Sequence, residues 1–348
     1  SLEALGPPPV PDDNPTTPEK VELGHMLFFD NRLSGNASLS CGGCHEPRWG
    51  WAGGSDLCRG YAGTSGWRNC PSVVNAAYYD ELFWGGAATS LEQQAPMAAT
   101  GAVEGHGHPV VMEERLAQVP EYVDRFREVF GTERPRIEDA WRAIAAFERT
   151  LVQTDTPFDR FREGESSALS TEARRGLGIF EGKGGCVRCH SGAFFTDGSY
   201  HNLGVPQNPR FEEDELVQIT FRFLNGTADI PEAIRRDTRI DLGRYYVTGL
   251  QEDMGAFRTP TLRYLAWTAP YMHNGVFYTL EEVVEFYDGG GGRDAVEANL
   301  GHSTRTELLQ PLGLTSQEKT DLVAFLESLS GDEIRPETPT LPLYGEAR

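Results

Sequence analysis

Two short segments of the chain combine a pair of thiols with an imidazole at a spacing that suits covalent haem attachment. In the pattern Cys-x-x-Cys-His, the two thiols add across the vinyl groups of haem, and the adjacent histidine ligates the iron from one side. The two copies are Cys41, Cys44 and His45, and Cys186, Cys189 and His190. Two such sites in one chain predict a protein that moves electrons.

A Cys-x-x-Cys pair can also be half of a zinc site or a redox-active dithiol. Zinc requires a second pair of ligands at knuckle spacing, and none follows either motif closely. A dithiol of the thioredoxin kind does not require the trailing histidine. The complete five-residue pattern, present twice, therefore favours two c-type haems.

The chain of 348 residues is long enough for two domains of ordinary size, and 39% of its residues are hydrophobic. It contains no apolar run of membrane-spanning length, and residues 1–11 lack the basic and apolar regions of a signal peptide. Because covalent haem attachment implies export, we expect that a leader has been removed and that the protein works in the periplasm.

The formal net charge of the chain is −21. Such a charge repels phosphates and argues against a nucleic-acid partner. A basic redox partner would be attracted at low salt. A solvated acidic surface, as in a salt-adapted organism, explains the charge equally well.

Six cysteines are present, and Cys58 and Cys70 lie outside the two motifs. In an oxidising compartment we expect a disulfide between them, which would pin the glycine-rich loop after the first motif. The alternative is a pair of free thiols.

A helix is predicted shortly before each motif. A Thr-Pro pair is suited to begin a helix over residues 18–29, and a Ser-Thr pair to begin one over residues 171–180. Both contain Gly-x-x-apolar-Phe, which we interpret as a weak internal repeat. The repeated residues are Gly24, Leu27 and Phe28, and Gly176, Ile179 and Phe180. A polar stretch separates the halves, so we expect an N-terminal haem domain over residues 1–165 and a C-terminal one over 166–348.

Further helices are indicated by apolar residues at helical spacing over residues 137–151. Two more helices are predicted by capping boxes, which pair Thr279 with Glu282 and Thr315 with Glu318. Residues 217–223 and 245–247 are the best candidates for strands. The predicted fold class is mainly α, with long irregular loops and little strand.

Longer stretches follow one another in order over nearly the whole chain. They are LFFDNRLSGNASLSCGGCH, RNCPSVVNAAYYDELFW, SLEQQA, FRTPTLR, TAPYMHNG and TLEEVVEFY. Their order and spacing resemble the bacterial di-haem cytochrome c peroxidase superfamily, including its MauG-type branch. The resemblance implies two cytochrome c-like domains, with a peroxide-reacting haem in the first and an electron-transfer haem in the second.

The resemblance makes His45 the proximal ligand of the peroxide-reacting haem, whose other face must stay open. Many members carry a histidine on the following loop that blocks this face until the enzyme is reduced. Here residues 60–69 contain none, which implies a MauG-like haem that needs no reductive activation. Glu104 matches the distal acid–base group and Gln94 its amide partner, which would orient peroxide, although Glu104 alone could be a surface acid. Trp84 matches a tryptophan between the haems and is also compatible with a core position.

The second haem would have His190 on one face. Fourteen residues after the histidine of the PYxH motif, where other members carry a methionine, this chain has Tyr287. A phenolate oxygen is a hard anionic donor that favours ferric iron and higher oxidation states, whereas a thioether favours ferrous iron. The alternative is a tyrosine packed beside a haem whose sixth position is free.

A calcium ion commonly lies between the haems in this family, and the matching positions are Asn75, Thr268 and Pro270. Asn75 alone is equally typical of a turn. His201 and His273 match positions near the haems, where they would bind propionates or ordered water and not iron.

The resemblance implies a periplasmic oxidoreductase that uses hydrogen peroxide and reaches a high-valent, bis-ferryl-like state. The tyrosine ligand favours a MauG-like role, in which the electrons come from a side chain of a partner protein. One alternative is peroxide detoxification with a small cytochrome or cupredoxin as donor. Another is a di-haem electron carrier or sensor without turnover, which would fill both axial positions and need no Glu104–Gln94 pair.

Overall fold

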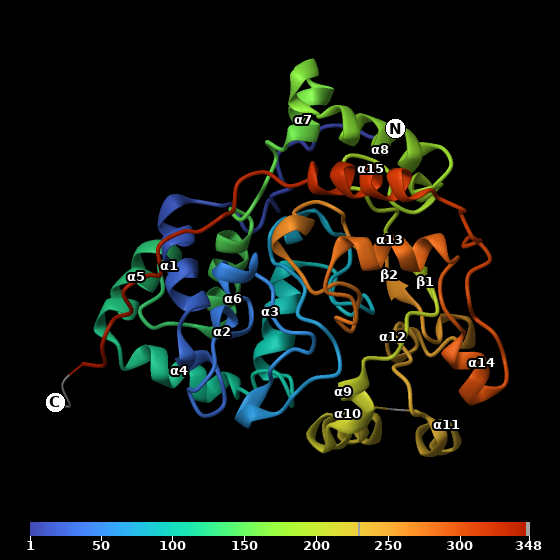
Figure 1. Ribbon diagram of the computed structural model, residues 1–348. Helices are drawn as coiled ribbons and strands as arrows, with labels where there is room; N and C mark the ends of the chain where they lie inside the picture. Colours follow the sequence, from blue (N-terminus) through green and yellow to red (C-terminus); the bar gives the residue numbers. More distant parts are fainter. Residues whose placement is uncertain (229, 346–348) are drawn as a thin grey trace.

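The computed structural model describes residues 1–228 and 230–345. The chain is mainly helical, and long loops connect its helices (Figure 1). The sheet of the described part consists of two short antiparallel strands, β1 (Tyr200–His201) and β2 (Phe257–Arg258). The predicted fold class is confirmed. Within the described ranges, no helix combines the length and the apolar character needed to cross a bilayer.

The predicted helices over residues 18–29, 137–151 and 171–180 correspond to α1, α6 and α8, and the two capping boxes open α13 and α15. In chain order the α-helices of the described part are α1 (Pro18–Phe28), α2 (Cys41–Cys44), α3 (Leu91–Thr100), α4 (Pro109–Ala117), α5 (Pro120–Phe130), α6 (Ile137–Glu148), α7 (Pro157–Arg162), α8 (Thr171–Glu181), α9 (Pro209–Glu213), α10 (Glu215–Thr227), α11 (Glu232–Asp237), α12 (Tyr245–Thr248), α13 (Leu280–Asp288), α14 (Ala295–Leu300) and α15 (Ser316–Glu327).

Each half of the chain contains two helices that cross at a glycine of the internal repeat. Helix α1 packs on α6, and α8 packs on α15. A Cβ atom added to Gly24 would overlap the carbonyl oxygen of Ala143, and one added to Gly176 would overlap that of Asp321. Glycine is required for so close an approach of two backbones. The weak repeat in the sequence therefore marks the same helix crossing, made once in each half.

Replacing Gly176 by Ala is expected to destabilise the protein by about 1–3 kcal/mol, because the added methyl group overpacks against α15. Gly178 lies in the same helix and has no atom within 4 Å of an added Cβ. Gly178→Ala should therefore stabilise the protein by about 0.5–1 kcal/mol through helix propensity alone. Denaturant unfolding of both variants measures the difference, and equal shifts would contradict the close crossing as the reason for Gly176.

Two main hydrophobic cores lie behind these crossings, one in each half. Each end of the chain packs against the core of the opposite half. Leu2 packs in the second core with Phe158 of α7, whereas Trp51 of the first core donates from Nε1 to the carbonyl of Ile334 at 2.8 Å. Figure 1 shows the N-terminus beside α8 and the C-terminal tail running past α1 and α5. The division into domains at residues 165 and 166 stays a prediction.

The two candidate strands were predicted wrongly. Residues 217–223 lie inside α10, and residues 245–247 lie in α12. Asp214 caps α10 by accepting from the N–H groups of Leu216 and Val217. Residues 217–223 read VQITFRF, in which apolar and polar side chains alternate, so this segment resembles a half-buried strand.

Candidate active site

The histidine of each motif is oriented by a carbonyl a few residues further along. Nδ1 of His45 lies 3.3 Å from the carbonyl oxygen of Trp51, and Nδ1 of His190 lies 3.1 Å from that of Phe195. Trp51 and Phe195 are both fully buried, with left-handed backbones at φ of 61° and 54°. With Nδ1–H donating to the carbonyl, Nε2 keeps its lone pair for a metal. Burial lowers the pKa of both imidazoles, which favours the neutral form that ligates.

None of the four thiols of the motifs takes part in a disulfide. Burial raises the pKa of Cys41 to about 12 and that of Cys186 to about 11, and it also raises the pKa values of Cys44 and Cys189. These groups are therefore protonated at neutral pH, unlike the low-pKa thiolates of redox-active dithiols. The protonated state disfavours the dithiol alternative.

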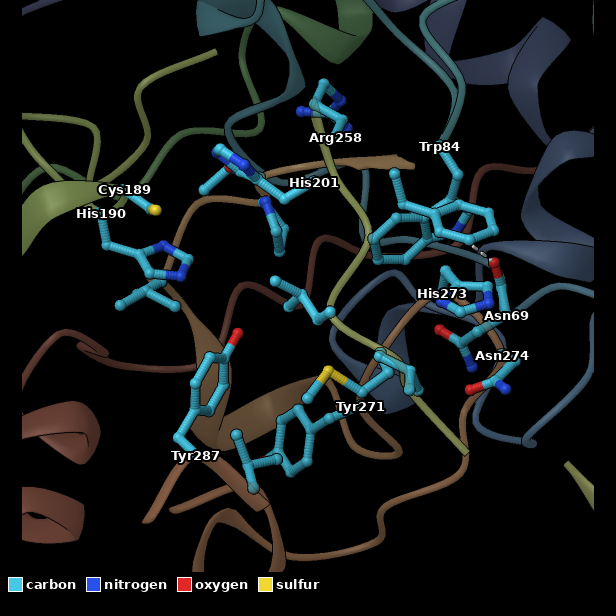
Figure 2. Close-up of a pocket in the computed structure, with 18 of the residues that line it drawn as sticks. Asn69, Trp84, Cys189, His190, His201, Arg258, Tyr271, His273, Asn274 and Tyr287 are labelled. Carbon is cyan, nitrogen blue, oxygen red and sulfur yellow. Dashed lines mark hydrogen bonds between the residues drawn. The ribbon is translucent and has the colours of Figure 1, made fainter. Parts of the chain in front are cut away.

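A large cavity lies beside the second motif and is lined by Cys186, Cys189, His190 and Tyr287. Figure 2 shows the imidazole of His190 and the hydroxyl of Tyr287 pointing into the same space. Tyr287 comes from the last turn of α13, whose first turn is held by a capping box. Burial, and then the neighbouring thiols, raise the pKa of Tyr287. A phenolate at this position therefore needs a cation as its counter-charge.

The walls of this cavity fit a c-type haem. They are mainly apolar, and the guanidinium groups among them include that of Arg258, which is 5% exposed. Its Nη1 has no hydrogen-bond partner among the described residues. A buried donor of this kind is costly unless an anion pairs with it, and a haem propionate is such an anion. Cys186, Cys189, His190 and Tyr287 would hold the porphyrin, and Arg258 would bind a propionate.

Trp84 extends from the first half of the chain into the wall of the same cavity. Its Nε1 donates to the carbonyl of Asn69 at 2.9 Å, and its own carbonyl accepts from the N–H of Arg258 at 2.9 Å. Its ring centroid lies 6.4 Å from that of His273 (Figure 2). Contacts from both halves therefore fix the indole at the boundary between them.

His201 and His273 also line this cavity. His201 lies 3.3 Å from Asp197, and His273 stacks on Phe257 with ring centroids 3.6 Å apart. Burial lowers the pKa of His273 to about 3, so the ring is neutral. Ligand atoms of Cys189, Asp197 and His201 lie within 4.8 Å of one another, but Cys189 belongs to the haem motif, so we do not interpret this group as a separate metal site. The predicted contacts of both histidines with propionates or water stay predictions.

Glu104 lies in the turn after α3, near the first motif. Burial and nearby carboxylates, Glu104 among them, raise the pKa of the Cys44 thiol. Burial also raises the pKa of Glu104, and nearby backbone amides and the guanidinium of Arg68 oppose this shift. The Glu104 side chain nevertheless keeps an exposed surface. A partly desolvated carboxyl that still reaches solvent can accept and return a proton.

The loop over residues 60–69 packs on this turn. The N–H of Tyr61 donates to the carbonyl of Val103 at 2.9 Å, and the Tyr61 ring stacks on His106 with centroids 4.6 Å apart. Gln94 lies half-buried on α3, the helix that leads into the turn. The histidine-free loop is thus attached to the turn of the predicted acid–base group. The catalytic roles of Glu104, Gln94 and Trp84 stay predictions.

A disulfide joins Cys58 and Cys70, whose Cα atoms are 5.0 Å apart. The N–H of Cys58 also donates to the carbonyl of Arg68 at 2.8 Å. The base of the loop is therefore closed. Within it, Arg68 forms two hydrogen bonds of 2.6 and 2.7 Å with the carboxylate of Asp241.

Of the predicted calcium ligands, Asn75 is buried, and Thr268 and Pro270 line the cavity beside the second motif. The Oδ1 atom of Asn75 accepts from the N–H of Gln153 at 2.8 Å. Its backbone is left-handed at φ of 62°, as turn asparagines often are. The arrangement suits a turn residue and leaves a lone pair on Oδ1 for a cation, so calcium stays a prediction.

Two buried charged groups near the motifs, Arg258 and Glu148, were not predicted from the sequence. Glu148 ends α6 and is 5% exposed; burial raises its pKa to about 8. It adds to the effect of burial in raising the pKa of Cys41, which places it near the first motif. The available signal was a Glu-Arg pair that interrupts the apolar face of a helix.

Glu148 is expected to make the protein less stable as the pH rises. Its pKa of about 8 lies above the ordinary value of 4.5, so the folded state holds a proton that the unfolded chain releases. The stability from this group is full below pH 4.5 and is lost as the pH rises towards 8. Glu148→Gln removes the ionisation, so its melting temperature should fall less over this range than that of the parent. Glu128→Gln, an exposed change on α5, should follow the parent, and a parallel decline in all three would contradict the shift.

A mainly α chain with two Cys-x-x-Cys-His motifs, each with an oriented imidazole, defines a di-haem c-type cytochrome. The family model for di-haem cytochrome c peroxidase matches residues 18–167. The chain is 50% identical over 344 residues to cytochrome-c peroxidase IdrP1 of Pseudomonas sp. (strain SCT), covering 98% of this chain and 89% of that protein. It is 36% identical over 335 residues to the methylamine utilization protein MauG of Methylorubrum extorquens, covering 96% and 84%.

A crystal structure of a MauG-like protein associated with microbial copper homeostasis is similar in fold, with a TM-score of 0.78 and 30% identity over 95% of this chain and 94% of that chain. The chain therefore belongs to the di-haem cytochrome c peroxidase family, in its MauG-type branch. It is an enzyme of the peroxidase class and a member of a family that carries two haems.

Proposed function

We propose that this protein reduces hydrogen peroxide to water at the first site, with electrons from a donor protein. One H₂O₂, two protons and two electrons give two water molecules. The proposal depends most on Glu104, a partly desolvated carboxyl near the first motif, on the turn against which the histidine-free loop packs. A carrier or sensor without turnover would need no such group.

Cys41, Cys44 and His45 would hold the first haem, which supplies the iron that binds and cleaves peroxide. Glu104 takes a proton from one peroxide oxygen and returns it to the other, so that water can leave. Gln94 donates a hydrogen bond that orients the peroxide. Burial raises the pKa of Glu104, which favours uptake of the peroxide proton.

Tyr287 gives the second site its MauG-like character in this proposal. As a ligand of the second haem, its hard anionic oxygen would favour oxidised iron more than a thioether would. Trp84, fixed between the halves, shortens the distance over which an electron must tunnel. With haems held at both sites, Trp84 would link them for electron transfer, and the second haem would supply a place to store an oxidising equivalent.

The electron donor that we propose is a small redox protein in the periplasm. A relative with 50% identity bears the name cytochrome-c peroxidase, whereas MauG is 36% identical. The higher identity to the cytochrome-c peroxidase favours a small redox protein as the electron donor over the side chain of a partner protein, which the resemblance to MauG favoured. The net charge of −21 suits a basic donor. The proposal includes a calcium ion at Asn75, Thr268 and Pro270, which metal analysis of the purified protein tests.

Steady-state turnover of the haem-loaded protein tests this function. Peroxide is added with a reduced, small, basic cytochrome c, and we expect two cytochromes oxidised for each peroxide consumed. Peroxide consumption without cytochrome oxidation, in the presence of a partner protein that becomes oxidised, would favour the MauG-like donor. If peroxide leaves the haem absorbance unchanged, the protein is a carrier or sensor.

A further inference from the structure

Helix α10 has an apolar face that points to solvent. Leu216, Ile219 and Phe223 are 55%, 63% and 50% exposed. Their spacing of three and four residues places them on one side of the helix. The opposite side is buried and includes Val217 and Phe221, so α10 is folded against the protein and still presents a second apolar face. Contiguous apolar surface of this kind marks an interaction site.

A cluster of acidic residues lies at the start of this face. Glu212, Glu213 and Glu215 are exposed, and no ion pair involves Glu213 or Glu215 among the described residues. Helix α10 itself contains one cation, Arg222. An apolar patch with an acidic rim complements a partner whose own apolar patch has a basic rim.

The inner side of α10 leads directly to the site. Phe221 packs edge to face on Trp67 with ring centroids 5.4 Å apart, and Trp67 lines the cavity beside the second motif. Trp67 is two residues from Asn69, whose carbonyl accepts from Nε1 of Trp84 at 2.9 Å. The exposed face is therefore about one helix diameter, roughly 10 Å, from an oxidisable side chain that is coupled to Trp84.

We infer that the exposed face of α10, formed by Leu216, Ile219 and Phe223 with the acidic residues at its start, is the docking surface for a small, basic, one-electron donor protein. The inference rests on the proposed function and names the surface that the donor uses. Three exposed apolar side chains suit the small interface of a transient redox encounter.

A second copy of this chain fits the face less well. Two chains of net charge −21 repel each other at low salt. A basic donor is attracted instead.

Binding of a small basic cytochrome c to the haem-loaded protein tests the inference. Ile219→Lys and the double variant Glu213→Gln/Glu215→Gln should each weaken binding roughly tenfold, and the double variant should also reduce the salt dependence. All these side chains are exposed, so the variants should fold. The control is Val110→Lys on α4, where an equally exposed residue (62%) lies on another helix.

Binding by both variants as tight as that of the Val110→Lys protein would overturn the inference. It would also be overturned if sedimentation showed a dimer that Ile219→Lys dissociates, because the face would then belong to a second copy. The rate of the peroxide reaction without donor should be the same in all variants. A parent that binds the cytochrome at α10 but does not react with peroxide would refute the proposed function and leave the docking surface supported.

Discussion

Replacing Glu104 by Gln is expected to slow the reaction with hydrogen peroxide by about 10²- to 10⁴-fold. Glutamine has nearly the same size and can still form hydrogen bonds, but it cannot accept the peroxide proton. Cleavage of the oxygen–oxygen bond then expels a poorer leaving group. Stopped-flow mixing of the haem-loaded protein with peroxide measures the rate constant directly, without a donor.

Two further variants make this result specific to the carboxyl group. Glu104→Asp keeps an ionisable group on a shorter side chain and should recover part of the rate. Glu128→Gln removes an exposed carboxyl on α5 and should react like the parent. Haem absorbance and unfolding curves must match the parent, so that a slow rate reflects chemistry. A Glu104→Gln protein that reacts at the parental rate would exclude this residue as the acid–base group.

The helices near the motifs could be predicted because their signals are local. Thr17 caps α1, and the boxes of Thr279 with Glu282 and Thr315 with Glu318 open α13 and α15 through contacts within one turn. Helix α10 could not be predicted in this way. The alternation of apolar and polar residues over 217–223 is typical of a strand, and the choice of a helix depends on packing against residues distant in the sequence.

In the candidate site, too, local features could be predicted and tertiary contacts could not. The thiols and imidazoles of the motifs follow from spacing within five residues. The contacts that orient these side chains could not be predicted from spacing, because each depends on the tertiary fold. The carbonyl that orients His45 belongs to Trp51, whose left-handed backbone gives no signal in the sequence, and the tail residue Ile334 holds that indole from the other end of the chain. Arg258 and Glu148 gain their importance only from burial.

Tyr287→Met is expected to raise the reduction potential of the second haem by about 0.1 V or more, within the roughly 0.8 V that axial ligands cover. A phenolate stabilises the ferric state through its charge, and a thioether stabilises the ferrous state. The burial that raises the pKa of Tyr287 also means that the charge of its phenolate is poorly screened by water, so its removal should have a large effect. Spectroelectrochemical titration measures both haem potentials.

The pattern of change across the two haems decides whether Tyr287 is a ligand. If it binds the second iron, Tyr287→Met shifts that potential and shortens the lifetime of the oxidised state formed with peroxide, while the first haem keeps its own potential. Tyr278→Phe, at an exposed tyrosine beside the same helix, should change neither. If Tyr287 only packs beside the haem, substitution with methionine leaves the second potential near that of the parent. Because the proposed storage of oxidising power depends on an anionic oxygen ligand at this position, an unchanged potential would remove the MauG-like part of the mechanism but leave peroxide reduction at the first site intact.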